Sequence, residues 1–107
     1  MALPPDLSTA RVVVVVFKMA GCGACAEYVP RFQRIARAYA QCLPIWIIDA
    51  NDPRYAQLAD RLRVSAVPAT FALKRGSGVL RLDGSSSDAE IVWLLDVAAR
   101  EALCPVD

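Results

Sequence analysis

The stretch Val12–Ala36, VVVVVFKMAGCGACAEYVPRFQRIA, decides the fold of this chain. It opens with Val12–Phe17, a β-branched apolar run without polar alternation, which predicts a strand covered on both faces of a sheet. From about Ala24 the pattern becomes helical, with apolar residues at Val29, Phe32, Ile35, Ala36 and Tyr39. A buried strand therefore leads directly into a helix, and two cysteines stand at the junction.

The rest of the chain continues to alternate between strands and helices. The further elements are a doubly buried strand at Ile45–Ile48, a helix opened by Asp52-Pro53, a loop at Val64–Pro68, strands at Ala69–Lys74 and Val79–Leu82 flanking a turn at Arg75–Gly78, and a last helix opened by the capping box Ser87–Glu90. The predicted order is β-α-β-α-β-β-α, which is an α/β fold.

Length and composition narrow the class of protein. The 107 residues leave room for one domain, residues 1–107, with an irregular lead-in at 1–10 and a C-terminal tail at about 101–107. A net charge of +1 indicates no excess of positive charge that would bind nucleic acid or an anionic membrane. The chain has no histidine, which excludes Ser-His-Asp hydrolases, Cys-His proteases and His-ligated metal sites.

Targeting signals and cysteine usage bear on the compartment. No basic segment leads into the valines, and the longest apolar run is far shorter than the ~20 residues that span a bilayer. We therefore expect a cytoplasmic protein, in which thiols are reduced. Four cysteines in 107 residues are too few for a disulfide scaffold, so a cysteine pair is expected to be catalytic or metal-binding.

Cys22 and Cys25 are the candidate reactive residues because of their position. Their spacing alone is weak evidence, since four cysteines produce such a pair by chance in roughly one chain in ten. At the start of a helix, however, Cys22 faces unpaired amides and the positive end of the helix dipole, which favour the thiolate. Cys25 lies one turn further along and is more buried. The pair offers an attacking sulfur and a resolving sulfur at the carboxyl end of a strand.

Several other residues match the pattern of a known family. They are Pro30 within the first helix, Asp49 and Pro53 after the second strand, Val67-Pro68-Ala69-Thr70 before the hairpin, and Gly84 before the last helix. With Cys22-Gly23-Ala24-Cys25 they make the chain resemble the thioredoxin superfamily over nearly its whole length. The resemblance implies a thioredoxin-like three-layer fold, with a central mixed sheet of four strands and helices on both faces. It also implies that Pro68 is cis and faces the cysteines.

Three residues depart from the family pattern. Gly21 replaces the usual tryptophan before the first cysteine, and Ala24 replaces the usual proline between the cysteines. Val16 stands where typical thioredoxins bury an aspartate that helps to move the proton of the second cysteine. These differences leave the reaction type intact and bear on its rate, on its redox poise and on recognition by the usual reductase.

The resemblance implies a thiol–disulfide oxidoreductase that reduces or exchanges protein disulfides. Cys22 would be the nucleophile and Cys25 the resolving residue, and the residues expected to contact substrate are Gly21, Gly23, Ala24, Val67 and Pro68. No bound cofactor or metal is expected. The expected partners are disulfide-containing proteins and an external reductase or thiol pool, without nucleic acid or membrane, and the chain is expected to be a monomer.

Three alternatives from other classes stay open. The first is a glutaredoxin-like enzyme that uses glutathione, although many glutaredoxins have a tyrosine or phenylalanine between their cysteines and this chain has Gly-Ala. The second is a non-catalytic module that uses the fold as a binding scaffold. The third is a zinc-binding domain, for which Cys42 and Cys104 lack the second paired spacing of an all-cysteine zinc site.

Cys42 and Cys104 are expected at the end of the domain opposite Cys22, because the first and last helices both run away from that site. As neighbours they could form a second disulfide worth roughly 4 kcal/mol in the chain-entropy model. In a reducing cell two free cysteines are the favoured state. Lys18, four residues before Cys22, could stabilise the thiolate by its charge, although a solvated lysine is the simpler interpretation.

Overall fold

The computed structural model describes residues 11–104 and confirms the α/β fold and the predicted order of its elements. The elements are β1 (Val12–Lys18), α2 (Gly23–Ala36), η1 (Arg37–Tyr39), β2 (Ile45–Asp49), η2 (Pro53–Tyr55), α3 (Ala56–Arg61), β3 (Ala69–Lys74), β4 (Ser77–Asp83) and α4 (Asp88–Glu101), where η denotes a short 3-10 helix. The expected lead-in at 1–10 and the last three residues of the expected tail lie outside the described residues.

The strands form one mixed sheet in the order β2-β1-β3-β4. β1 runs parallel to β2 and antiparallel to β3, which is antiparallel to β4. Val12–Phe17 is buried throughout, which confirms the prediction of a strand covered on both faces. The prediction of a second doubly buried strand is wrong for Ile45–Ile47, which are half-buried. The reason is that β2 lies at an edge of the sheet, with a neighbour on one side only.

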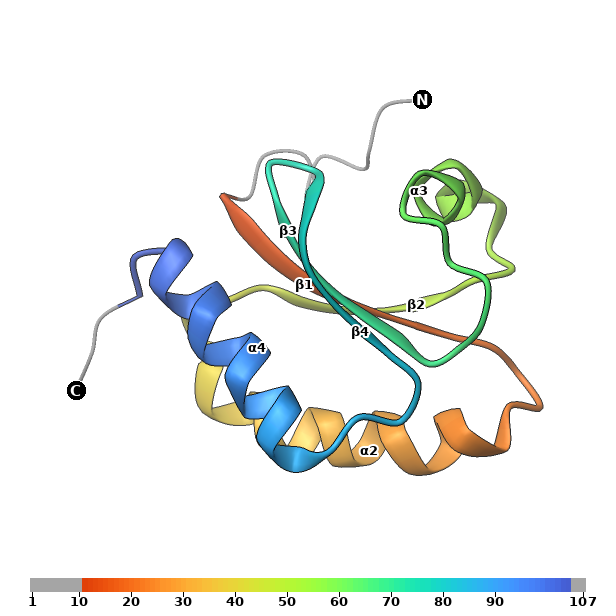
Figure 1. The fold of residues 1–107 in the computed structure, drawn as a ribbon, viewed down its shortest axis with the longest axis horizontal. Helices are drawn as coiled ribbons and strands as arrows, with labels where there is room; N and C mark the ends of the chain where they lie inside the picture. The colour runs from red at the N-terminus through yellow and green to blue at the C-terminus, as the bar shows by residue number, and fades with distance from the viewer. Residues whose placement is uncertain (1–10, 105–107) are drawn as a thin grey trace.

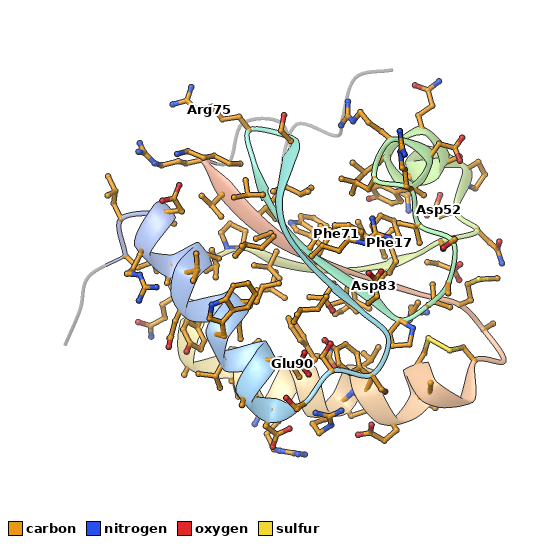
Figure 2. The ribbon with its side chains drawn as sticks, in the orientation of Figure 1. Phe17, Asp52, Phe71, Arg75, Asp83 and Glu90 are labelled. Atoms are coloured by element: carbon orange, nitrogen blue, oxygen red, sulfur yellow. A yellow bond between two sulfur atoms is a disulfide. The ribbon has the colours of Figure 1, made fainter. Side chains whose placement is uncertain are left out.

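The sheet separates two apolar cores, because successive side chains of a strand point to opposite faces. α2 and α4 cover one face and α3 covers the other (Figure 1). Val12, Val14 and Val16 pack toward α2 and α4, whereas Val13, Val15 and Phe17 pack toward α3. On the α3 side the rings of Phe17 and Phe71 meet edge to face, with centroids 5.8 Å apart (Figure 2). This layering holds the end of β1 and the start of α2 in a fixed relation.

The hairpin and the last helix follow local signals. The hairpin turn is Arg75-Gly76, with φ of 52° and 84°, so β4 begins at Ser77 and not at Val79 as predicted. Positive φ at both central residues suits a two-residue turn, because its twist matches that of the strands. Ser87 opens α4 with the predicted capping box, in which its side chain accepts from the Glu90 amide.

Candidate active site

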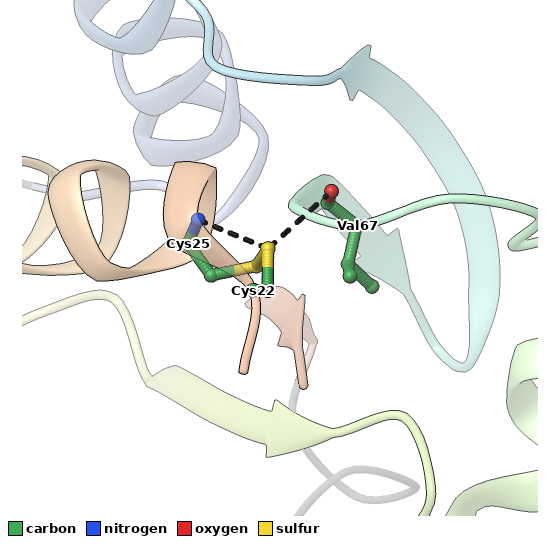
Figure 3. Close-up of a disulfide and its surroundings, with 3 residues drawn as sticks. All are labelled: Cys22, Cys25 and Val67. Atoms are coloured by element: carbon green, nitrogen blue, oxygen red, sulfur yellow. Dashed lines mark hydrogen bonds between the residues drawn. A yellow bond between two sulfur atoms is a disulfide. The ribbon is translucent and has the colours of Figure 1, made fainter. Parts of the chain in front are cut away.

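Cys22 occupies the N-cap of α2, after the short segment that follows β1. Its Sγ accepts a hydrogen bond from the Cys25 amide at 3.1 Å, and the two cysteines form a disulfide (Figure 3). The sulfur therefore takes the place of a capping oxygen and satisfies one of the free amides of the helix start. The sulfur of Cys22 thus lies at the positive end of the helix dipole.

The two sulfurs differ in their access to solvent. Cys25 is buried, with 4% of its surface exposed, whereas Cys22 is half-buried. The residues beside Cys22, namely Gly21, Gly23 and Ala24, have small or no side chains and are exposed. A Cβ atom added at Gly21 or at Gly23 would meet nothing within 4 Å, and Gly21 has a φ of 78°, which favours glycine. An approaching chain can therefore reach Cys22 first.

The loop before β3 faces the cysteines. Its Val67–Pro68 peptide bond is cis, and the carbonyl oxygen of Val67 lies 3.8 Å from Sγ of Cys22 (Figure 3). Pro68 is buried, and its carbonyl accepts a hydrogen bond from the Gly84 amide at 2.9 Å. The loop is thus tied to the segment that precedes α4, and Val67 is held beside the half-buried sulfur.

A shallow pocket of about 240 Å³ lies beside Val67. Its lining consists of Met19, Ala50, Asn51, Ala56, Ala59, Asp60, Val64, Ser65, Ala66 and Val67. Most of these side chains are small and apolar, and Asp60 contributes the carboxylate of the pocket. No motif in the sequence indicates this pocket, because it combines residues from four separate segments that meet only in the folded chain.

The core beneath α2 holds two buried hydroxyl groups whose pairing no sequence motif indicates, although Thr70 belongs to the motif Val67-Pro68-Ala69-Thr70. Tyr28 Oη lies 2.7 Å from Thr70 Oγ1, and both residues are 0% exposed. Burial raises the pKa of the Tyr28 hydroxyl, and the hydrogen bond with Thr70 acts in the opposite direction. Val16 is the partner of Thr70 across the β1–β3 pair and is likewise fully buried. A tyrosine at helical spacing is typical of an ordinary core position, so the signal was weak.

Cys42 and Cys104 lie at the other end of the α2–η1 segment. Two free thiols are the state that a reducing cytoplasm favours, but the structure joins these residues in a disulfide, with a Cα–Cα distance of 5.8 Å. The topology explains the pairing, because α2 and α4 cover the same face of the sheet and run toward the same end of it (Figure 1), where η1 leads to Cys42 and α4 to Cys104. Lys18 ends β1, where its carbonyl accepts from the Ala50 amide at 2.8 Å, and a role for its charge stays a prediction.

Residues 11–104 offer no group of three or more Cys, Asp or Glu side chains that could hold a metal ion. All four cysteines are instead engaged in the two disulfides. In the same range no helix combines the length and the apolar character that crossing a membrane requires.

Comparisons with known proteins agree with this geometry. The thioredoxin family model matches residues 6–96. Similar solved structures include a Plasmodium falciparum thioredoxin, with a TM-score of 0.73, 21% sequence identity and 86% of each chain covered. A Fasciola hepatica thioredoxin has a TM-score of 0.71 and 20% identity, with 88% of this chain and 86% of that chain covered. Spinach chloroplast thioredoxin f has a TM-score of 0.72 and 23% identity, with 88% of this chain and 83% of that chain covered. No curated protein gives a significant match.

The structural neighbours establish the fold alone, since their sequence identities to this chain are low. The family model goes further because it covers most of the chain, including both cysteines of the disulfide at the start of α2 and the Val67–Pro68 loop. The resemblance inferred from the sequence is therefore confirmed. This chain belongs to the thioredoxin family.

Proposed function

We propose that this chain is a thiol–disulfide oxidoreductase that reduces or exchanges protein disulfides through Cys22 and Cys25. The observation that carries the proposal is the arrangement of two sulfurs at the start of α2. One is half-buried and accepts a hydrogen bond from a helix amide, and the other is buried behind it. Such an arrangement activates the outer sulfur and keeps the inner one within bonding distance.

In the reducing direction the Cys22 thiolate attacks one sulfur of a substrate disulfide. The substrate S–S bond breaks, its other sulfur leaves as a thiolate and takes up a proton, and Cys22 is left in a mixed disulfide. Cys25 then loses its proton and attacks Sγ of Cys22. The mixed disulfide breaks, the second substrate thiolate leaves, and the Cys22–Cys25 disulfide forms. The substrate gains two electrons, which an external dithiol or thiol pool must restore to the chain.

Within residues 11–104 the proton of Cys25 has no buried carboxylate to receive it. The buried side chains there that carry an oxygen are the hydroxyl-bearing Tyr28, Tyr55, Thr70 and Ser86, and Val16 is apolar. The proton that Cys25 loses in the resolving step is therefore released to solvent.

The Val67 loop and its pocket supply a binding surface for the substrate chain. Within residues 11–104, neither the amide nor the carbonyl of Val67 makes a backbone hydrogen bond, so both can pair with an extended segment of substrate. Gly21, Gly23 and Ala24 leave room for that segment above the disulfide. The pocket beside Val67 can receive a side chain next to the substrate cysteine, and Asp60 would favour one that ends in a cation.

Reduction of insulin by dithiothreitol, followed as the turbidity of the released B chain, tests the proposal. The chain should accelerate the reaction, and Cys22→Ser should abolish the acceleration. Cys25→Ser should accumulate a mixed disulfide with insulin, visible by mass spectrometry. A Cys42→Ser/Cys104→Ser variant is the control and should keep the activity. Full turnover by Cys22→Ser would contradict the proposal, and activity only with glutathione would assign the chain to the glutaredoxin-like alternative.

A further inference from the structure

The hydroxyl pair formed by Tyr28 and Thr70 is a directional contact in a largely apolar core, in which Ser86 is the other buried hydroxyl near Tyr28. The two oxygens are 2.7 Å apart, and neither residue has exposed surface. Removal of a hydroxyl from water has a free-energy cost unless the group forms a hydrogen bond, and the Tyr28–Thr70 bond offsets that cost for both groups. Unlike apolar packing, a hydrogen bond also restricts distance and angle. The pair therefore fixes the position of α2 relative to β3.

Tyr28 lies close to the buried sulfur on α2. Cys25 and Tyr28 are three residues apart and share the buried face of the helix. Side chains of a helix lean toward its N-terminus, so the ring of Tyr28 leans toward the turn that holds Cys25. The guanidinium carbon of Arg31 lies 5.4 Å from the centre of the same ring and packs against it. The ring is thus held between its hydroxyl partner and Arg31.

Thr70 lies close to the other half of the site. It follows Pro68 by two residues on β3, where it pairs with Val16 of β1 and Leu82 of β4. Its position is therefore set by strands on both sides. The Tyr28–Thr70 bond connects the helix that carries both cysteines to the strand that carries the Val67–Pro68 loop, although the two residues are 42 positions apart in sequence.

We propose that Tyr28 and Thr70 are positioning residues for the resolving step, which keep Cys25 aligned behind Cys22 while the Val67 loop holds the substrate. This inference rests on the proposed function. In the mixed disulfide, the substrate is bonded to Cys22 and paired with the loop, so its orientation is set by the loop. The direction from which Cys25 attacks Cys22 is set by α2, because both residues lie at the start of that helix. A change in the distance between helix and loop would misalign this attack, while the first attack by Cys22, at the half-buried end, would be little affected.

The experiment measures the two steps separately. The reduced chain is mixed with a disulfide-linked peptide dimer, whose backbone can pair with Val67, and acid-quenched at successive times. Peptide mass mapping then gives the fraction of Cys22 that carries the peptide and the fraction joined to Cys25. Tyr28→Phe and Thr70→Val should each slow the decay of the Cys22 adduct, by roughly tenfold if the hydrogen bond acts fully on this step, with little change in adduct formation. Thr70→Ser, which keeps the hydroxyl, should restore the decay.

Two further variants separate positioning from general stability. Tyr39→Phe removes the hydroxyl that donates to Asp96, at the far end of the same helical segment, and should leave both steps unchanged. The double variant Tyr28→Phe/Thr70→Val should decay no more slowly than either single variant, because both substitutions remove the same bond. If Tyr28→Phe fails to fold, the comparison of Thr70→Val with Thr70→Ser decides the matter.

The outcomes distinguish this inference from the function on which it rests. If the adduct of the unsubstituted chain decays to the Cys22–Cys25 disulfide and both hydroxyl-deleted variants decay at the same rate, the positioning role is wrong and the proposed function stands. Equal slowing of formation and decay would also overturn the positioning role. If the unsubstituted chain forms no adduct at Cys22, the proposed function itself fails.

Discussion

Removal of the second disulfide should lower the stability of the chain by a large and calculable amount. The perturbation is Cys42→Ser/Cys104→Ser. Cys42 is exposed and Cys104 is half-buried, so the serine hydroxyls can remain hydrated and the substitutions themselves have a small cost. What is lost is the restriction that the disulfide places on the unfolded chain.

The size of the effect follows from the sequence separation of 62 residues. In the chain-entropy model a loop of that length corresponds to roughly 4 kcal/mol. The entropy of unfolding of a chain this long is on the order of 0.2 kcal/mol/K, so the Tm should fall by roughly 15–20 °C. The disulfide at Cys22 and Cys25 spans a separation of 3, for which the same model gives only about 1.5 kcal/mol.

Thermal unfolding followed by far-ultraviolet circular dichroism measures the difference. The unsubstituted chain, the Cys42→Ser/Cys104→Ser variant and a Cys22→Ser/Cys25→Ser variant are compared under oxidising conditions, after a check that unfolding is two-state. The variant that lacks the long loop should have a much lower Tm than the variant that lacks the short one. A smaller fall for the long loop than for the short one would refute the entropic reasoning.

Two other predictions concern acidity and substrate choice. Three glutamates have a pKa below the ordinary 4.5 because each accepts a hydrogen bond: Glu27 from Arg31, Glu90 from the Ser87 backbone and Glu101 from Lys74. The stability that these hydrogen bonds contribute is present above pH 4.5. It is lost as the pH falls through the lowered pKa values and the carboxylates become protonated. The Tm should therefore decline below about pH 4.5, and a Tm that rises on acidification would contradict this. Asp60→Asn should reduce the preference for a disulfide peptide with Arg beside its cysteine over a matched Glu peptide, by about two- to fivefold in kcat/KM. An unchanged ratio would remove Asp60 from substrate recognition.

The features that sequence predicts best here are those set by local physics. The valine run of β1, the cysteine at the helix start and the capping box at Ser87 each depend on residues within a few positions of one another. The family resemblance added the Val67–Pro68 loop, because its motif is short and specific. These parts together account for β1, for the start of α4 and for the two sulfurs that lie at the start of α2 beside the Val67–Pro68 loop.

The features that escaped prediction depend on contacts between distant segments. Ile45–Ile47 has the composition of a central strand, and only the order of the strands makes β2 an edge. The pocket at Asp60 combines four segments, and the Tyr28–Thr70 bond joins a helix to a strand. In each case the residue types are ordinary, and the significance comes from what lies next to them in space.

The presence of one disulfide at each end of the α2–η1 segment has a practical consequence for work with this protein. Two separate two-electron couples give four covalent states of one chain: fully oxidised, fully reduced and two half-reduced isomers. The isomers have the same mass and the same number of thiols, yet one has an open long loop and the other an open short one. A thiol titration that returns two per chain therefore does not define the sample, and preparations with equal counts can differ in both activity and melting behaviour.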